Sequence, residues 1–255
     1  MKAGKKALKY IAFALVFLCI AGGVAFKAYT SNFYREDEKL TAEFASEVGD
    51  LVHAYSDDYG MVFIPTNHNY QAIIVFYPGG KVEFSAYSGL MYELASRGYL
   101  CLLPRMPENL AFLEVNAVEG IKARYPEEAE ETEALDWYLA GHSLGGVAAS
   151  SYLGDHMDEY AGLIMCASYT TTDLSNSNLR MLSTYGSLDG VLNMDKYEDS
   201  KALWPQDATE KVIQGGNHSY FGCYGVQRSD GKPQITNKEQ VCETADLIDA
   251  WIREK

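Results

Sequence analysis

The residue pattern with the clearest chemical meaning is Gly-His-Ser-Leu-Gly-Gly at positions 141–146. It follows an apolar run and precedes a stretch of small residues typical of a helix. The form G-x-S-x-G predicts a serine at the tip of a sharp strand-to-helix turn, in a strained backbone conformation. Gly141 and Gly145 are expected to flank that turn because a Cβ would collide there. Ser143 is therefore the predicted nucleophile.

A serine hydroxyl is a weak nucleophile near neutral pH, so Ser143 needs a histidine that accepts its proton. Of the five histidines, only His156 and His218 follow Ser143 in the chain. His156 lies in a polar stretch close behind the predicted turn, which is typical of a solvated surface residue. His218 follows a strand-like run, where a base on a strand-end loop belongs. We predict His218 as the general base; the alternative is a loop histidine without chemistry.

The acid that orients this histidine is expected between the serine and the histidine in the chain. Asp189 stands at the end of a strand-like run, in a turn before Gly190. Asp173 lies in a polar loop where it would initiate a turn, and Asp195 lies within a predicted helix. We predict Asp189 as the acid, with a plain turn aspartate as the alternative reading.

Acyl transfer also needs hydrogen-bond donors for the oxygen that becomes negative in the tetrahedral intermediate. One predicted donor is the backbone N–H of Leu144, next to the serine. The second is expected in the loop 78–81, where paired glycines let the main chain approach a ligand. Gly80 is the favoured donor and Lys81 the next; a tight turn without this role is the alternative.

The substrate site should lie near the loops that follow the predicted strands. Lys81, Met106 and Tyr220 are predicted to border it, from the loops after two strands and the loop of the predicted base. The polar loop that begins at Tyr169 is expected beside the site as well; an ordinary connecting loop is the alternative. His53 and His68 precede the predicted catalytic loops, and no compact His, Cys and carboxylate cluster has metal-ligand spacing. We therefore expect no metal and no organic cofactor.

The elements that must position these residues alternate between strand and helix. This alternation predicts an α/β fold with a mostly parallel central sheet and helices on both faces. The gaps between elements are too short for a large cap. The predicted strands are 61–64, 72–77, 99–103, 135–140, 162–167, 181–185 and 211–214, and the predicted helices are 87–97, 110–125, 145–153, 194–203 and 238–253.

Four segments together resemble the motif sites of the α/β-hydrolase superfamily: Gly-His-Ser-Leu-Gly-Gly, Gly-Ser-Leu-Asp-Gly, Gly-Gly-Asn-His-Ser and Tyr-Pro-Gly-Gly. They cover the chain from about residue 72 onward. More narrowly, the chain resembles the cap-poor, dienelactone-hydrolase-like branch and its amino-terminally anchored bacterial members. Dienelactone hydrolases carry cysteine where this chain has Ser143, so lactone specificity does not follow. The resemblance implies esterase or related hydrolase chemistry on a small-molecule acyl substrate.

The charge of the chain argues against nucleic acid as a partner. The 255 residues carry a formal net charge of −14, and the first 27 contain five lysines and no acid. The remainder therefore has 16 basic and 35 acidic residues, a net charge of −19. Such a surface repels phosphate backbones. The oligomeric state has no signature in the sequence.

The amino terminus differs from everything after it. Residues 10–26 are uncharged and mostly apolar, and lysines precede them. Seventeen residues is the short end of a membrane span, and longer than a typical signal-peptide core. We predict a cytoplasmic leader and transmembrane anchor in 1–32 and a hydrolase domain in 33–255. Lysines before an apolar span favour a cytoplasmic amino terminus, so the domain is expected outside the cytoplasm. If the leader is cleaved, the domain is secreted.

Two of the five cysteines could form a disulfide. Cys223 and Cys242 flank a polar loop, but spacing alone leaves the free and bridged states equally open. Cys19, Cys101 and Cys166 lie in apolar runs and are expected to be inert.

Together these features predict a membrane-anchored serine hydrolase that cleaves a carboxylic ester or similar acyl bond. Ser143, Asp189 and His218 are the expected catalytic residues. Acyl transfer or amide cleavage by the same residues stays open, because the acceptor leaves no mark on the sequence. A non-catalytic envelope protein on the same fold is the alternative from another class, although binding alone would not require all three residues.

Overall fold

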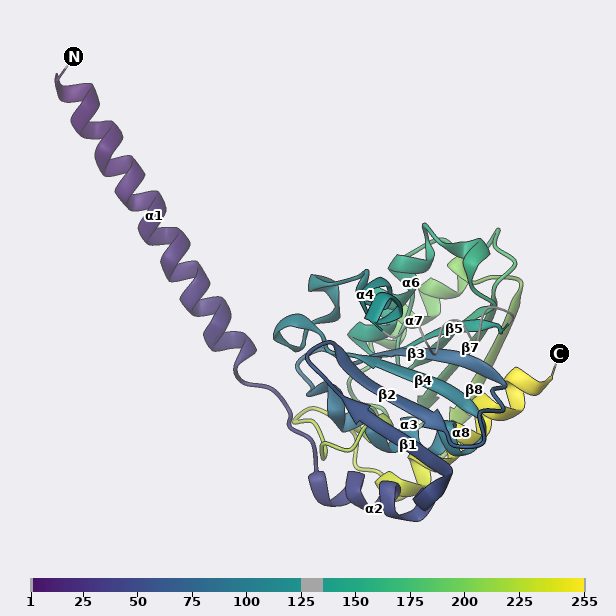
Figure 1. The fold of residues 1–255 in the computed structure, drawn as a ribbon. Coiled ribbons are helices and arrows are strands. Elements are labelled where there is room, and N and C mark those ends of the chain that lie inside the picture. The colour runs from purple at the N-terminus through teal and green to yellow at the C-terminus, as the bar shows by residue number, and fades with distance from the viewer. Residues whose placement is uncertain (1, 125–134, 255) are drawn as a thin grey trace. The chain divides into compact units, whose positions relative to one another are not determined.

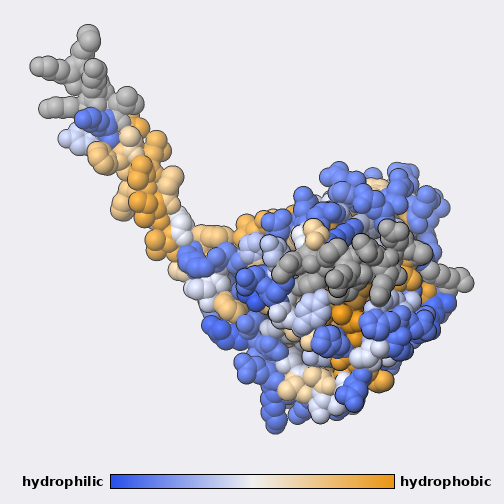
Figure 2. Space-filling view, viewed as in Figure 1, coloured by the Kyte–Doolittle hydropathy of each residue, from blue (hydrophilic) through white to orange (hydrophobic). Residues whose placement is uncertain are grey.

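A computed structural model describes residues 2–124 and 135–254 of the chain. Residue contacts divide the chain into two units, Met1–Phe33 and Tyr34–Lys255. The first unit is one helix, α1 (Lys2–Thr30) (Figure 1). Its segment Lys9–Thr30 is long and apolar enough to cross a membrane, and a signal sequence would have the same properties. Figure 2 shows apolar side chains along this helix.

The second unit is built on one sheet, which has eight strands in the described part of the chain, in the order β1-β2-β4-β3-β5-β6-β7-β8. The first two strands pair antiparallel, and the neighbours from β4 through β8 pair parallel. The predicted α/β fold with a mostly parallel sheet is therefore confirmed. The strands are β1 (Val52–Ser56), β2 (Gly60–Pro65), β3 (Ala72–Tyr77), β4 (Tyr99–Pro104), β5 (Trp137–His142), β6 (Gly162–Cys166), β7 (Arg180–Gly186) and β8 (Asp207–Ile213).

Helices cover both faces of the sheet (Figure 1). Apolar residues of α2, α3 and α8 pack in one core cluster, and those of α4 and α6 pack in another on the opposite face. The central strand β3 is buried along its whole length, which explains its unbroken apolar sequence. The helices are α2 (Glu38–Val48), α3 (Ser88–Ser96), α4 (Ala117–Arg124), α6 (Leu144–Leu153), α7 (Met194–Ser200) and α8 (Asn237–Arg253).

Strand β1 was not predicted from the sequence. It is an edge strand, and only Val52 at its start is buried, so it lacks the apolar run that marks the central strands. The segment predicted as strand 135–140 forms β5 two residues later. The predicted helix 110–125 is broken: Ala111–Leu113 forms one short 3₁₀ turn and α4 begins at Ala117. Its last residue, 125, lies outside the described residues.

The two cysteines that could have bridged are both free thiols in this structure. Cys223 is buried, and its Sγ donates a hydrogen bond to Asn237 Oδ1 at 3.5 Å. Burial raises the pKa of the Cys223 thiol to about 12, which keeps it protonated and unreactive. The disulfide between Cys223 and Cys242 is thus not formed.

The connection from β5 to α6 is a tight turn with strained backbone. Ser143 adopts φ 51° and ψ −122°, a conformation that residues with a Cβ rarely take. Glycines on both sides make the turn possible. A Cβ on Gly141 would lie 2.6 Å from the backbone of Gly145, and a Cβ on Gly145 would lie 2.1 Å from the carbonyl oxygen of Tyr77. Helix α6 therefore begins in direct backbone contact with the end of β3.

The substitution Gly145→Ala tests this packing. We expect it to lower the stability of the protein by about 3 kcal/mol or to prevent folding, because the new methyl group meets backbone that has no room to move. Thermal unfolding of the full-length chain in mild detergent measures the change. As a control, Gly120→Ala in α4 adds a methyl group with no atom within 4 Å. That variant is expected to be more stable by about 0.5–1 kcal/mol. An unfolding temperature of Gly145→Ala equal to that of wild type would show that the turn is not tightly packed.

Candidate active site

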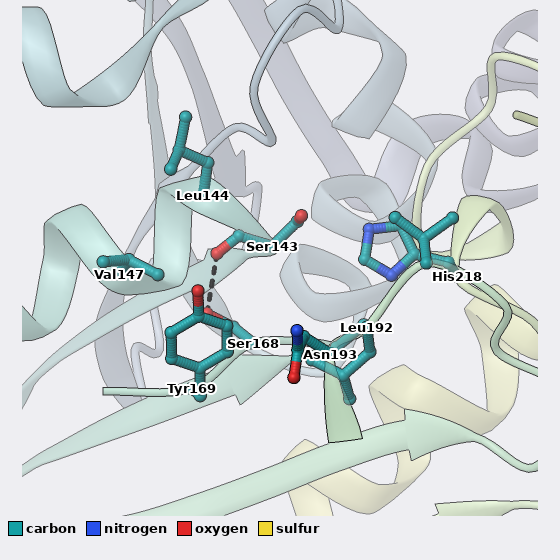
Figure 3. A pocket seen from close by; sticks show the side chains of 10 residues that line it. Ser143, Leu144, Val147, Ser168, Tyr169, Leu192, Asn193 and His218 are labelled. Atoms are coloured by element: carbon teal, nitrogen blue, oxygen red, sulfur yellow. Dashed lines mark hydrogen bonds between the residues drawn. The ribbon is translucent and has the colours of Figure 1, made fainter. Parts of the chain in front are cut away.

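Ser143 stands at the carboxyl end of β5, and its backbone is hydrogen-bonded on both sides. Its N–H donates to the carbonyl oxygen of Cys166 at 2.9 Å. Its carbonyl oxygen accepts from the hydroxyl of Ser168 at 2.6 Å. The strained turn is held by these bonds to the end of β6, and the side chain points toward the imidazole ring of His218 (Figure 3).

Asp189 and His218 form a buried pair. Asp189 Oδ2 lies 2.9 Å from His218 Nδ1, and the side chains are 2% and 1% exposed. The other carboxylate oxygen, Oδ1, accepts hydrogen bonds from the N–H groups of Val191 and Leu192, each at 2.8 Å. An ionised carboxylate only accepts, so the proton of the neutral imidazole is on Nδ1. His218 Nε2 therefore carries a lone pair.

That nitrogen is available for proton transfer. Nε2 of His218 is buried and has no hydrogen-bond partner among the described residues. The ring faces the serine side chain, as Figure 3 shows. Serine–base hydrogen bonds are often long without substrate and shorten in the reacting complex. The arrangement of Ser143, His218 and Asp189 can activate a hydroxyl for attack on an acyl carbon.

The three residues come together because of the sheet topology. Ser143 follows β5, Asp189 follows β7 and His218 follows β8, and these strands run parallel in the order β5-β6-β7-β8. Carboxyl ends of parallel strands lie at one edge, and ligands of such sheets bind there. The structure thus places all three predicted residues at one edge, in the order along the chain that the sequence suggested.

The loop after β3 lies against the turn that carries Ser143. A Cβ on Gly80 would lie 2.8 Å from Leu144 Cδ2, so the two backbones approach closely. The N–H of Gly79 donates to the Tyr87 hydroxyl, and the N–H of Lys81 donates to the carbonyl of Asn109. In the described part of the chain, the N–H groups of Gly80 and Leu144 donate no hydrogen bond. These two are therefore the free donors beside the serine.

A buried hydrogen-bond chain that the sequence did not reveal connects this loop to the base. The N–H of Gly79 donates to the hydroxyl of Tyr87 at 3.0 Å, and Tyr87 donates to Nδ1 of His142 at 2.8 Å. His142 Nε2 donates in turn to the backbone carbonyl of His218 at 3.0 Å. Burial, followed by the charge of His218, lowers the pKa of His142 well below its usual range, so His142 stays neutral and both ring nitrogens are satisfied.

A cavity of about 170 Å³ opens beside Ser143 and His218 (Figure 3). Its wall is largely apolar, with a few hydroxyl and amide groups. The lining residues are Ser143, Leu144, Val147, Ala167, Ser168, Tyr169, Val191, Leu192, Asn193 and His218. Of these residues, the sequence pointed to Ser143, Leu144 and His218, and to the loop that begins at Tyr169. The rest of the wall comes from the loops after β6 and β7 and from α6, and no local motif marks it.

The three residues predicted to bind substrate do not line this cavity. Met106 is 3% exposed and packs in the core cluster that α4 and α6 share, so the structure does not bring it to this cavity. Lys81 takes a positive φ of 59° at the end of the glycine loop. The backbone N–H of Tyr220 donates to Asn217 Oδ1, one turn beyond the base. Within the described residues, no group of three His, Cys, Asp or Glu side chains could hold a metal ion.

Comparison with known proteins agrees with this geometry. A model described as "Alpha/beta hydrolase family" matches residues 73–242, about two thirds of the chain. This span runs from β3 through the start of α8 and includes the serine turn and the Asp189–His218 pair. A search of curated proteins found no match. The fold, the order of the strands and this match show that the chain belongs to the alpha/beta hydrolase family.

Proposed function

We propose that this hydrolase cleaves carboxylic esters through an acyl-enzyme on Ser143. The observation that carries the proposal is the state of His218: Asp189 holds Nδ1, and the buried Nε2 is free on the side of the serine. A histidine that only stabilised the fold would be expected to use both nitrogens, as His142 does.

The chemistry follows from these positions. Ser143 Oγ attacks the acyl carbon while His218 Nε2 takes its proton. The N–H groups of Leu144 and Gly80 donate to the oxygen that becomes negative. Collapse of the tetrahedral intermediate breaks the ester bond, and His218 returns the proton to the leaving alcohol. Water then gives a proton to the same nitrogen and attacks the acyl carbon. The bond to Ser143 Oγ breaks, His218 returns the proton to Oγ and the acid leaves, while Asp189 holds the imidazole in place.

The cavity supports a short acyl group as substrate. Its volume of about 170 Å³ is below the 300–1,000 Å³ that is usual for sites of drug-sized ligands. Val147, Val191 and Leu192 give it an apolar wall, which suits a short alkyl chain. The hydroxyl of Tyr169 and the amide of Asn193 add polar groups that would accommodate a small polar substituent.

The nucleophile is tested with a fluorophosphonate probe on the purified full-length protein. We expect one labelled serine, Ser143, and no labelling of Ser143→Ala. His218→Ala and Asp189→Asn are expected to lower hydrolysis of p-nitrophenyl acetate by about three orders of magnitude or more, because the base is lost or its tautomer is wrong. Asp173→Asn, an exposed turn aspartate, is the control and should keep wild-type activity. Labelling unchanged in Ser143→Ala would overturn the catalytic proposal.

The acyl-group preference is tested with p-nitrophenyl esters of increasing chain length. We expect kcat/KM to be highest between acetyl and butyryl and to fall for octanoyl, which exceeds the cavity. Val147→Ala, which enlarges the wall, should shift the preference toward longer chains, whereas Val226→Ala, at an exposed position, should not. A preference that rises steadily to octanoyl and beyond would contradict a short-acyl site.

We propose further that α1 anchors the enzyme in a membrane with the body outside the cytoplasm. The apolar segment Lys9–Thr30 is preceded by lysines, which are retained on the cytoplasmic side. A protease is added to cells whose outer envelope is opened and whose cytoplasmic membrane is intact. It is expected to degrade the hydrolase domain. A cytoplasmic marker protein in the same cells should survive. Protection of the body equal to that of the marker would reverse this topology.

A further inference from the structure

Asp230 makes an unusual set of hydrogen bonds beside the candidate active site. Its Oδ1 accepts from three backbone N–H groups, those of Gly190 at 3.1 Å, His218 at 3.2 Å and Gly231 at 2.8 Å. Its Oδ2 accepts from the N–H of Ser219 at 2.8 Å and from its hydroxyl at 2.6 Å. One carboxylate thus contacts the residue after Asp189, the base itself and the residue after the base.

The loop that carries Asp230 packs directly against the loop of the acid. A Cβ on Gly231 would lie 1.7 Å from the carbonyl oxygen of Leu188, and a Cβ on Gly190 would lie 2.7 Å from the N–H of Gly231. The loop is fixed from the other side by Asn217, whose Nδ2 donates to the Gly231 carbonyl at 3.0 Å. The half-buried side chain of Asp230 therefore stands on a loop that is held close to the loop of the acid.

Asp230 is not a second acid for the base. Within the described residues, its hydrogen bonds come from backbone N–H groups and the Ser219 hydroxyl, and none comes from an imidazole nitrogen. The ring nitrogen Nδ1 of His218 is taken by Asp189. The side chain instead connects the backbones on which the acid and the base stand.

We propose that Asp230 is a positioning residue that sets the distance and angle between Asp189 and His218 by clamping their two loops together. The proposal rests on the catalytic roles assigned above. Five donors face the two carboxylate oxygens, and a carboxylate can accept at both of its oxygens. An asparagine would present its NH₂ group to the backbone N–H donors at one end of the side chain. The hydrogen bonds at that end would be lost, and the facing donor groups would repel each other.

The expected kinetic effect is large because proton transfer depends on orientation. A misplacement of about 1 Å lowers a rate by about a hundredfold. Among the described residues that line the cavity, Asp230 is hydrogen-bonded only to the His218 backbone, so the fit of the acyl group should be preserved. Loss of the clamp is therefore expected to lower kcat and to leave KM almost unchanged.

The experiment compares Asp230→Asn with wild type, both full-length in mild detergent. We expect kcat for p-nitrophenyl acetate to fall by about a hundredfold with KM changed less than about threefold. Asp173→Asn is the matched control, because Asp173 also accepts from a backbone N–H and a serine hydroxyl, those of Ser175. It removes the same kind of contacts away from the base and should leave kcat and KM unchanged.

A second readout does not depend on activity. The proton that His218 Nδ1 shares with Asp189 should give a low-field proton NMR resonance, absent in His218→Ala. We expect Asp230→Asn to shift or broaden this resonance and Asp173→Asn to leave it as in wild type. Should Asp230→Asn not fold, Ser219→Ala removes one of the five donors and is expected to lower kcat by about tenfold.

The outcomes separate the two proposals. Wild-type kcat and an unchanged resonance in Asp230→Asn, in an active enzyme, would overturn the positioning role and leave the proposed function intact. A rise in KM as large as the fall in kcat would also overturn it, since that result indicates a damaged substrate site. If wild type neither hydrolyses esters nor reacts with the probe, the proposed function fails, and the resonance still decides whether Asp230 holds the pair.

Discussion

The hydrogen bond between Asp189 Oδ2 and His218 Nδ1 is the interaction around which the candidate active site of this protein is built. The pair is almost fully buried, so each partner depends on the other to satisfy a polar group removed from water. The loops hold both residues independently. Val191 and Leu192 donate to the second oxygen of Asp189, and the backbone of His218 is bonded at both its N–H and its C=O. The imidazole is thus fixed before any substrate arrives, which is the preorganisation that proton transfer requires.

Backbone strain on the other side of the site is supported by the sheet. Ser143 and Ala167 both have positive φ, and each follows a central strand directly. Such residues cost about 1–3 kcal/mol each and persist only where their surroundings over-determine them. Here the ladder of backbone hydrogen bonds continues past the strand ends, from Ser143 to Cys166 and from Ala167 to Thr184. The buried strands β5, β6 and β7 therefore stabilise the conformation that exposes the serine hydroxyl.

His142 links the two sides. Because it is neutral and fully hydrogen-bonded, it connects the glycine loop, through Tyr87, with the backbone of His218. Glycine is needed at position 79, since a Cβ there would lie 2.6 Å from both the His142 ring and the Tyr87 hydroxyl. The loop with the free Gly80 N–H and the loop with the base are consequently positioned by one buried network, and a change in either is transmitted to the other.

The sequence by itself determined the alternation of strands and helices, the serine turn and the order of Ser143, Asp189 and His218, because these signals are local: periodicity, flanking glycines and strand ends. It missed the edge strand β1, in which every residue after Val52 is partly or fully exposed. It also did not reveal that Met106 packs in the core, since an apolar loop residue can turn to the core or to a site. The wall of the cavity and the contacts of His142 and Asp230 were decided only by the tertiary structure. These contacts join residues separated by tens of positions, and which of them meet depends on how parallel strands bring their carboxyl ends to one edge.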